Sequence, residues 1–475
     1  MTYATATATI ADLRAKRVSA RELLDAHIAR NEALRARLNA VVESDIARAF
    51  RDADAIDAAR ARGEVPGALA GVPMTIKDGF DVENMPATSG NPAFADRPKT
   101  CRDAELVARA RGAGAVIWGK SNVPFMLGDF QSYNAIYGTT NNPYDVTRVP
   151  GGSSGGAAAA LAAGITPLEI GSDIGGSLRH PANFCGVCSL KPTWGILPMR
   201  GHVPPPPGVE SGGVDLGVGG PMARNVADLK LLWNVLRKTQ PPARRAAKGA
   251  RIALFDEQSG WPLAKAVKAR VEAAAKACAD AGMEVERARL PLDMNAMLVT
   301  YHDLLTPIIA AGFPEKLLAQ WSQMRDADSE AVRTGRDASG QARYRLRATA
   351  GAKEIAAAQA ARAAQKDRME IFFADCDAIL MPITPVPAFP HDHSDPINAR
   401  MLAMDGAHIP YMSALDWIAL ATSLHLPALA IQAGQTEDGL PVGVQLVGPE
   451  GGEDRLFDLA AAAEEVLGGF APPPL

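Results

Sequence analysis

The chain has 475 residues, with 47% hydrophobic residues, 21% charged residues and a formal net charge of -4, and its charges form no long run of either sign. This composition excludes a dedicated nucleic-acid or anionic-membrane surface, which needs clustered Lys and Arg. With no secretory h-region, no apolar stretch of ~18 residues and only five cysteines, the sequence predicts a soluble cytoplasmic protein without a disulfide scaffold.

The first expected elements are two helices. Ser19 and Glu22 have the spacing of a capping box, and apolar residues at helical spacing follow them, so a helix should begin there. A second helix is expected from about Asp45 to Arg62, and turn residues from Gly63 to Gly71 end it.

From Gly71 to Gly220, short apolar runs alternate with Gly-rich turns and Ala-rich helical stretches. That alternation predicts an α/β sheet with helices on its faces. Helices are expected from Leu304 to Phe373, followed by more strands and a last helix that ends at Gly468 with Leu456, Leu459, Ala463 and Val466 on one face. The predicted strands cover 72–76, 115–118, 168–170, 378–381, 427–431 and 442–447.

Strand-like segments lie toward both ends of the chain, and no Pro/Ser-rich linker separates them. We therefore expect one domain over residues 1–475, with a helical insertion at 304–373. The Pro-rich and Gly-rich stretch 204–213 is interpreted as a stiff loop within this domain.

Two Gly-rich motifs match known sites but lack the required context. Gly114, Gly119, Lys120 and Ser121 have the spacing of a phosphate-binding P-loop, yet the residues between the glycines form an apolar run that indicates a buried strand. Nucleotide binding is therefore not expected.

The second motif is Gly152, Ser154 and Gly156, which match the G-x-S-x-G elbow of α/β-hydrolases. The elbow needs a preceding strand, but 142–150 contains two prolines, an Asp and an Arg. An α/β-hydrolase-like esterase that uses Ser154, with His391 or His425 completing its triad, is kept as an alternative.

The third motif is GSDIGGSLRHP, in which Ser177 directly follows Gly175 and Gly176. Glycines let the backbone turn so that several N–H groups face one point beside the hydroxyl, as an oxyanion hole requires. The motif by itself fits a plain Gly-rich turn equally well. Asp173 and Arg179, which flank the loop, are interpreted as its structural clamp.

Two further pairs of residues have the chemistry of metal ligands. Cys185 and Cys188 form a CxxC, and His391 and His393 lie two positions apart, but neither pair has further ligands in its vicinity to complete a site. We therefore expect no metal, and packing or surface roles for these side chains.

The segments GVPMTIKDGF around Lys77, PGGSSGG around Ser153 and GSDIGGSLRHPANFCGVCSLKPT around Ser177 together resemble the amidase signature family. The resemblance covers most of the chain except 304–373. It implies a large, mixed, twisted β-sheet covered by helices on both faces, and no cofactor. It also implies a catalytic triad of Lys77, Ser153 after a cis peptide, and Ser177, which follows Ser153 by 24 positions.

The residues support the same roles. Lys77 ends an apolar run, and desolvation would lower its pKa from about 10.4 so that a neutral amine is available. That amine would draw the proton of Ser177 through Ser153 and return it to the departing nitrogen. Backbone N–H groups of Ile174, Gly175, Gly176 and Ser177 would hold the oxyanion, and water would hydrolyse the acyl-enzyme.

By resemblance, Met126, Leu127, Gly128 and Phe130 line the acyl side of the pocket, and Ser154 shapes the adjacent turn of the substrate site. A hydrophobic or aromatic acyl group is expected, on a small-molecule carboxamide, anilide, carbamate or ester. Amidotransferase A-type subunits of the family usually have Arg-Gln after the nucleophile, where this chain has Arg179 and His180.

A stand-alone amidase, monomer or homodimer, is therefore favoured over an amidotransferase A-type subunit, which stays as an alternative. A binding module with a dead site is disfavoured because all three triad positions are intact.

Overall fold

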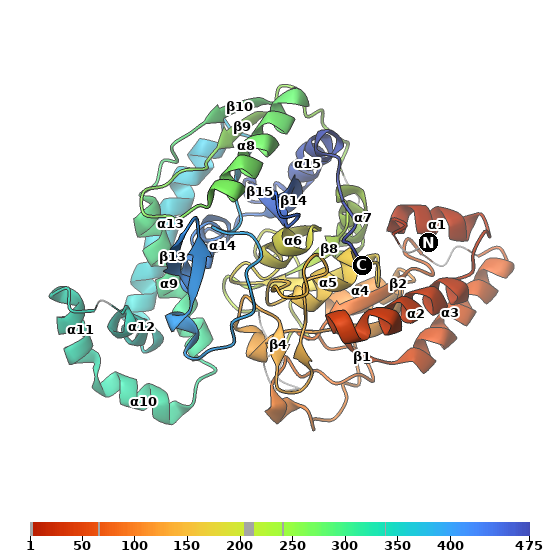
Figure 1. Ribbon diagram of the computed structural model, residues 1–475, viewed down its shortest axis with the longest axis horizontal. Helices are drawn as coiled ribbons and strands as arrows, with labels where there is room; N and C mark the ends of the chain where they lie inside the picture. Colours follow the sequence, from red (N-terminus) through yellow and green to blue (C-terminus); the bar gives the residue numbers. More distant parts are fainter. Residues whose placement is uncertain (1–2, 65–66, 204–212, 240–241, 338) are drawn as a thin grey trace.

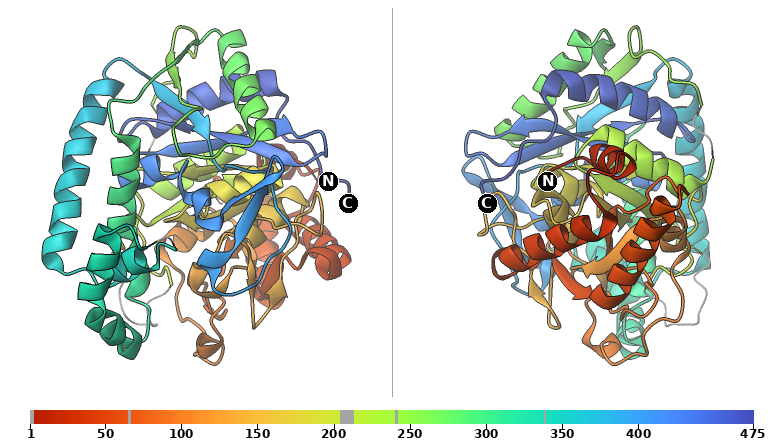
Figure 2. Two further views of the ribbon diagram at one scale, coloured as in Figure 1. Left: turned by 60° about the vertical axis from the view of Figure 1, so that its left-hand side comes forward. Right: turned by 90° about the vertical axis from the view of Figure 1, so that its right-hand side faces the viewer.

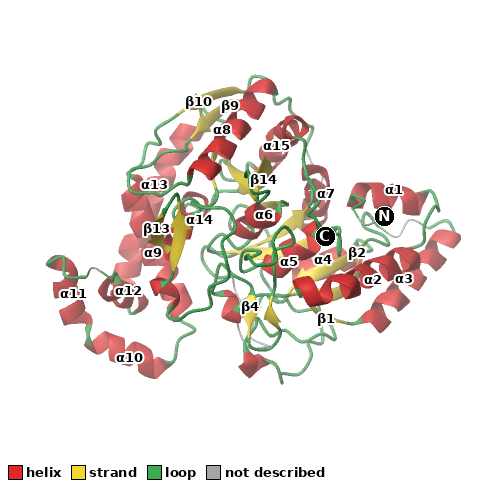
Figure 3. Ribbon diagram, viewed as in Figure 1, coloured by secondary structure: helices red, strands yellow, loops and turns green. Residues whose placement is uncertain are grey.

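A computed structural model of the chain describes residues 3–64, 67–203, 213–239, 242–337 and 339–475. Most of the expected loop 204–213 lies outside the described residues. Figure 3 shows helices packed around a central band of strands. The strands are β1 (Val41–Ser44), β2 (Pro73–Lys77), β3 (Val116–Ser121), β4 (Tyr133–Asn134), β5 (Gly138–Thr139), β6 (Leu168–Asp173), β7 (Cys188–Lys191), β8 (Val218–Ala223), β9 (Arg251–Leu254), β10 (Glu284–Arg287), β11 (Ala378–Pro382), β12 (Met401–Met404), β13 (Ala407–Pro410), β14 (Ala428–Gln435) and β15 (Pro441–Val447).

Helices precede, follow and separate these strands. The α-helices are α1 (Ala6–Arg14), α2 (Ala20–Leu38), α3 (Ile46–Ala61), α4 (Glu105–Gly112), α5 (Gly155–Ala162), α6 (Arg179–Cys185), α7 (Val226–Arg237), α8 (Lys265–Asp280), α9 (Met294–Ala310), α10 (Glu315–Gln323), α11 (Arg325–Arg333), α12 (Gln341–Ala348), α13 (Ala352–Phe373), α14 (Ala419–Ser423) and α15 (Glu453–Leu467). Short 3₁₀ turns cover Pro92–Phe94, Phe125–Leu127, Ile397–Ala399 and Tyr411–Leu415.

Within the described residues, eleven strands form one sheet in the order β1-β3-β2-β6-β8-β7-β14-β15-β11-β9-β10. The sheet is mixed: β2 runs parallel to β3 and β6, β9 runs parallel to β10 and β11, and the remaining neighbours are antiparallel. Helices lie beside the strands of the sheet (Figure 1). The predicted α/β class and the mixed sheet covered by helices are confirmed.

The first long helix begins where the capping box predicts. Ser19 Oγ accepts from the N–H of Glu22 at 3.1 Å, and the N–H of Ser19 donates to Glu22 Oε2 at 2.8 Å. The reciprocal bonds satisfy two backbone donors at the start of α2. The second predicted helix is also present, as α3.

The last helix differs from the expectation at one position. Leu456, Leu459 and Ala463 of α15 are buried, but Val466 is 46% exposed. With 3.6 residues per turn, Leu467 lies nearer the centre of the buried face than Val466 does, and Leu467 packs against the core. Val466 still shares the predicted helix face with Ala463, but it lies at the margin of that face in the last turn before Gly468 and is therefore exposed.

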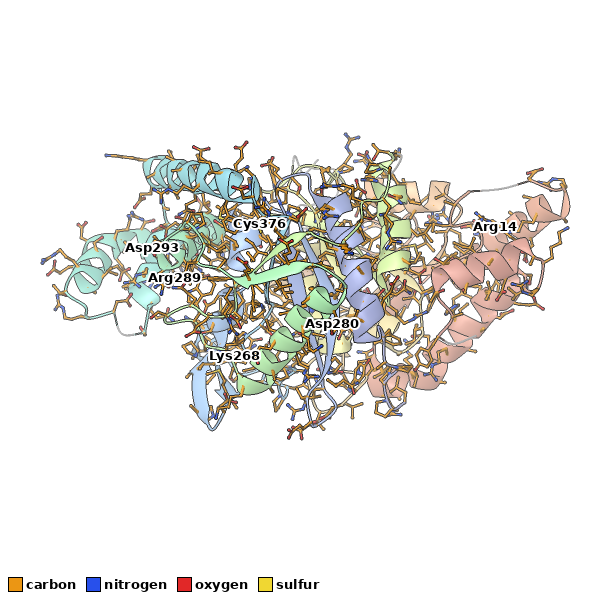
Figure 4. All side chains as sticks on the ribbon, turned by 90° about the horizontal axis from the view of Figure 1, so that it is seen from above. Arg14, Lys268, Asp280, Arg289, Asp293 and Cys376 are labelled. Atoms are coloured by element: carbon orange, nitrogen blue, oxygen red, sulfur yellow. The ribbon has the colours of Figure 1, made fainter. Side chains whose placement is uncertain are left out.

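Helices α9 to α13 follow one another with no strand among the described residues between them, and this run begins at Met294, ten residues before the expected start at Leu304. α9 and α13 pack side by side at one edge of the molecule (Figure 2). Seen from above, Asp293 at the start of this run lies at the opposite end of the molecule from Arg14 of α1 (Figure 4). We propose that residues 1–475 are one domain, because the sheet takes strands from both halves of the chain.

The order of the strands determines where the chemistry can lie. β2 and β6 are parallel neighbours, with Thr75 opposite Glu169 and Ile76 opposite Ile170. Their carboxyl ends therefore meet at one edge of the sheet, which is where sites form in parallel α/β sheets. Lys77 ends β2, and the Ser177 loop follows β6.

Candidate active site

Three elements bring the predicted triad residues to this edge. Lys77 is the last residue of β2, Ser153 lies in the turn before α5, and Ser177 lies in the loop between β6 and α6. The peptide bond between Gly152 and Ser153 is cis. The N–H of Ser154 donates to the carbonyl oxygen of Ser177 at 3.2 Å. This backbone hydrogen bond links the turn that contains Ser153 to the loop that contains Ser177.

The amine of Lys77 is surrounded by serine oxygens. Its Nζ lies 2.7 Å from Ser153 Oγ, 3.0 Å from Ser172 Oγ and 3.3 Å from the carbonyl oxygen of Ser172. Lys77 is fully buried and Ser153 is 1% exposed. The amine is therefore held by three uncharged oxygens rather than by a carboxylate.

This environment changes the protonation of Lys77. Burial lowers its pKa to about 7, while the charges of Asp173 and Glu169 partly oppose that effect. A buried ammonium group loses its hydration, and uncharged oxygens compensate for that loss only in part. A large fraction of Lys77 is therefore neutral near pH 7.

The loop with Ser177 presents backbone donors beside its hydroxyl. The N–H of Gly176 donates to Asp173 Oδ1 at 2.9 Å, whereas the N–H groups of Gly175 and Ser177 have no acceptor in the described part of the chain. Gly176 has a φ of +88°, and a Cβ there would lie 2.5 Å from His180 Nε2, so only glycine fits. Ser177 is 7% exposed.

A buried ion pair fixes this loop, as expected from its flanking charges. Arg179 Nη2 lies 3.0 Å from Asp173 Oδ1, and Arg179 also donates to the carbonyl of Ile418 and to the side chain of Gln445. Burial opposes the charge of Asp173, but Arg179 outweighs it and holds the pKa of this carboxyl well below its usual value. The clamp joins the loop to the segment before α14 and to β15.

Replacing Arg179 by methionine should therefore destabilise the protein. Asp173 would remain as an uncompensated buried charge, which costs about 3–5 kcal/mol. Urea unfolding measures this loss. The control is Arg17→Met, because the Arg17–Asp12 pair is exposed and should contribute less than about 1 kcal/mol. Equal effects of the two substitutions would contradict the clamp.

The predicted acyl-side residues lie in a loop that packs against the turn before Ser153. A Cβ on Gly152 would lie 2.3 Å from the carbonyl oxygen of Asp129, so this loop packs directly on the residue before Ser153. Met126 and Leu127 have φ values of +51° and +60°, which are strained for residues with side chains. Gly128 is exposed.

Phe130 is the innermost apolar side chain of that loop. It is 9% exposed, and its ring centroid lies 5.2 Å from those of His180 and Tyr411. Tyr411 donates to the buried carboxylate of Asp129, which also pairs with Arg400 at 2.7 Å. These contacts hold the acyl-side loop against the segment that contains β12 and β13.

The geometry does not support the elbow at Ser154. Residues 140–152, all of them described, contain no strand, and Ser154 is fully buried with its hydroxyl 3.4 Å from the carbonyl of Ser172. His425 is engaged elsewhere: its Nε2 lies 2.8 Å from Asp215 and 3.1 Å from Arg362.

The remaining sequence motifs have packing contacts. Lys120 of the P-loop-like run lies in β3, fully buried, with Nζ 2.6 Å from Asp78. Cys185 and Cys188 are buried free thiols, and His393 stacks on Tyr133 at 3.7 Å between ring centroids. Among the described residues, no group of three or more His, Cys, Asp or Glu side chains could hold a metal ion.

Sequence reasoning missed three polar residues around Lys77. Ser172 lies within the GSDIGGSLRHP motif, but only its place on β6, the strand beside Lys77, brings it to the amine. Glu169 is buried, accepts from Thr75 Oγ1 at 2.5 Å, and burial raises its pKa to about 8. His202 Nε2 lies 2.9 Å from Ser172 Oγ.

No helix in the described residues is both long enough and apolar enough to cross a bilayer.

The chain is similar in sequence and in overall structure to known proteins. A family model described as Amidase matches residues 22–457. The A-type subunit of glutamyl-tRNA(Gln) amidotransferase from Salinispora tropica is 32% identical over 96% of each chain. Indoleacetamide hydrolase of Bradyrhizobium diazoefficiens is 33% identical over 98% of this chain and 86% of the relative. The solved structure of the peptide amidase PAM with chymostatin matches with a TM-score of 0.77 and 26% identity over 99% of both chains.

Proposed function

Because the chain belongs to the amidase signature family of amide hydrolases, we propose that it cleaves amide C–N bonds with Ser177 as nucleophile, Ser153 as proton relay and Lys77 as base. The single observation that carries this assignment is the buried amine of Lys77, 2.7 Å from Ser153 Oγ. An amine with a pKa of about 7 can accept a proton at neutral pH, which an ordinary lysine cannot.

The proton would travel in both directions along one path. Lys77 takes the hydroxyl proton of Ser153 as Ser153 takes that of Ser177, and Ser177 Oγ attacks the carbonyl carbon. The resulting Lys77 ammonium returns a proton through Ser153 to the nitrogen of the leaving amine. Water then repeats the sequence on the acyl-enzyme and releases the acid.

Backbone donors would stabilise the tetrahedral intermediate. The N–H groups of Gly175 and Ser177 are the donors we assign to the oxyanion, with Ile174 beginning the same turn. Gly176 N–H is occupied by Asp173, so we assign Gly176 to shaping the loop in this conformation. Donors fixed where charge develops are worth about 3–4 kcal/mol each.

We propose an aromatic or hydrophobic acyl group for the substrate. Leu127 and Phe130 supply apolar surface, and the T-shaped contact of Phe130 with His180 forms an aromatic wall behind the nucleophile loop. The name of the relative indoleacetamide hydrolase also denotes an amide with an aromatic acyl part. Met126 and Gly128 complete the proposed lining, whereas Ser154, which was also expected there, is fully buried and is assigned to shaping the adjacent turn.

A panel of small molecules tests this function. The purified chain should show its highest kcat/KM on an arylacetamide or an anilide, lower values on the matched carbamate and ester, and no measurable hydrolysis of free glutamine. Preferred hydrolysis of glutamine would instead favour an amidotransferase A-type subunit, which the 32% identical relative keeps as the second candidate. Esterase activity without amide hydrolysis would contradict the proposal.

A further inference from the structure

A histidine outside the triad is linked to its base by one hydroxyl. Ser172 Oγ lies 3.0 Å from Lys77 Nζ on one side and 2.9 Å from His202 Nε2 on the other. Ser172 is 5% exposed, so water has little access to this hydroxyl. The three side chains form a polar row that leads away from Ser153.

The position of the His202 ring is fixed independently of Ser172. Its centroid lies 4.8 Å from that of Phe80, edge to face, and its backbone N–H donates to the carbonyl of Met199 at 3.0 Å. The N–H of Val203 donates to the carbonyl of Gly79 at 2.8 Å, which ties this segment to the residues just after β2. The imidazole therefore approaches Ser172 from a rigid support.

The donors and acceptors around the Lys77 amine determine where the Ser172 proton must point. A neutral amine has one lone pair and two N–H groups, and the lone pair must face Ser153 to receive its proton. The two N–H groups then need acceptors, which are the carbonyl oxygen and the Oγ of Ser172. A hydroxyl that accepts from the amine must donate its own proton elsewhere.

We propose that His202 is a positioning residue for the proposed triad: its Nε2 accepts the Ser172 hydroxyl proton, which keeps that proton away from the Lys77 lone pair. This inference rests on the proposed function. Without the acceptor, the Ser172 hydroxyl turns toward Lys77 and competes with Ser153 for the same lone pair.

Burial, more than charge, keeps the imidazole in its neutral, accepting form. Lys77 of β2 faces it through Ser172, and Asp173 and Glu169 of β6 are the carboxyl groups that act on Lys77. Burial, followed by the charge of Lys77, lowers the pKa of His202 to about 3. The ring is therefore neutral from pH 5 to pH 9. A lone pair on Nε2 then requires the tautomer with the proton on Nδ1.

The test uses His202→Phe, which keeps an aromatic ring against Phe80 and removes both nitrogens. The readout is the rate at which an aryl sulfonyl fluoride modifies Ser177, measured from pH 5 to pH 9. The plateau rate should fall about 10- to 100-fold, the loss expected when a buried hydroxyl has no partner. The midpoint should also move to lower pH, because Ser172 becomes a poorer acceptor for the ammonium form. His202→Gln, which restores an acceptor, should recover most of the rate.

Two matched variants separate this role from a general loss of packing. His27→Phe removes another buried imidazole, bonded to the Ile165 carbonyl at 3.0 Å, and should leave the rate unchanged. Adding His202→Phe to Ser172→Ala should cost nothing further, because the linking hydroxyl is already gone, and a further loss would show that His202→Phe acts through packing.

The outcomes also separate this inference from the function on which it rests. A wild-type rate in His202→Phe, a matching loss in His27→Phe, or no recovery in His202→Gln would overturn the role of His202. Failure of the unmodified chain to react at Ser177 would overturn the proposed function itself.

Discussion

Replacing Ser177 by alanine is expected to lower kcat/KM on the best amide substrate by about 10⁴-fold or more, because no covalent intermediate can form. Ser177 lies in a turn where its own N–H and that of Gly175 have no acceptor among the described residues. The Asp173–Arg179 pair holds this loop. Steady-state kinetics with enzyme free of wild-type contamination measures the loss. Binding of the substrate should change much less than turnover.

Ser154→Ala is the matched control, because it removes a hydroxyl one residue from the relay. Ser154 is fully buried and its hydroxyl is a long 3.4 Å from the Ser172 carbonyl, so we expect a loss within about tenfold. The opposite ranking, with Ser154→Ala inactive and Ser177→Ala active, would restore the α/β-hydrolase alternative.

Replacing Lys77 by methionine is expected to lower kcat/KM by a similar factor, about 10⁴-fold or more. Methionine has nearly the length of lysine and fills the same buried space, but it cannot accept a proton from Ser153. The loss should not be recovered at high pH. If Lys77→Met kept substantial activity, another base would have to be found.

Lys77→Met should also change how the free energy of unfolding depends on pH. The pKa of Lys77 is lower in the folded chain, about 7, than the ordinary value of 10.5, so protons bind preferentially to the unfolded chain between these values. As pH falls from 10 to 7, the wild type should lose about 1.4 kcal/mol of unfolding free energy per pH unit from this group. Lys77→Met lacks that contribution, and urea unfolding at several pH values compares the two. Parallel pH dependences would contradict the buried neutral amine.

Much of the fold could be predicted because its strands are strongly apolar. Pro73 to Ile76 and Val442 to Val447 lie in buried strands, and continuous apolar runs are the signal of such strands. Strands at the margin of the structure lacked that signal. Residues 284–287, which form the edge strand β10, are mostly polar and largely exposed, and the hairpin of β12 and β13 is also short and mostly exposed.

The triad positions could be predicted from motifs, but their surroundings could not. Ser172 and His202 are 30 positions apart, and only the pairing of β2 with β6 and the return of the chain to Gly79 bring them to Lys77. The occupation of the Gly176 N–H by Asp173 likewise depends on the turn itself rather than on residue types. Distances of this kind follow from tertiary packing, which no local pattern encodes.

The pH dependence of Ser177 acylation tests the central claim most directly. The intact chain is treated with an aryl sulfonyl fluoride between pH 5 and pH 9, and the modified peptide is mapped by mass spectrometry. The adduct should lie on Ser177, and its rate of formation should rise about tenfold per pH unit until it levels off near the Lys77 pKa of about 7. An adduct on Ser154, or a rate on Ser177 that does not change with pH, would contradict a neutral lysine acting through Ser153.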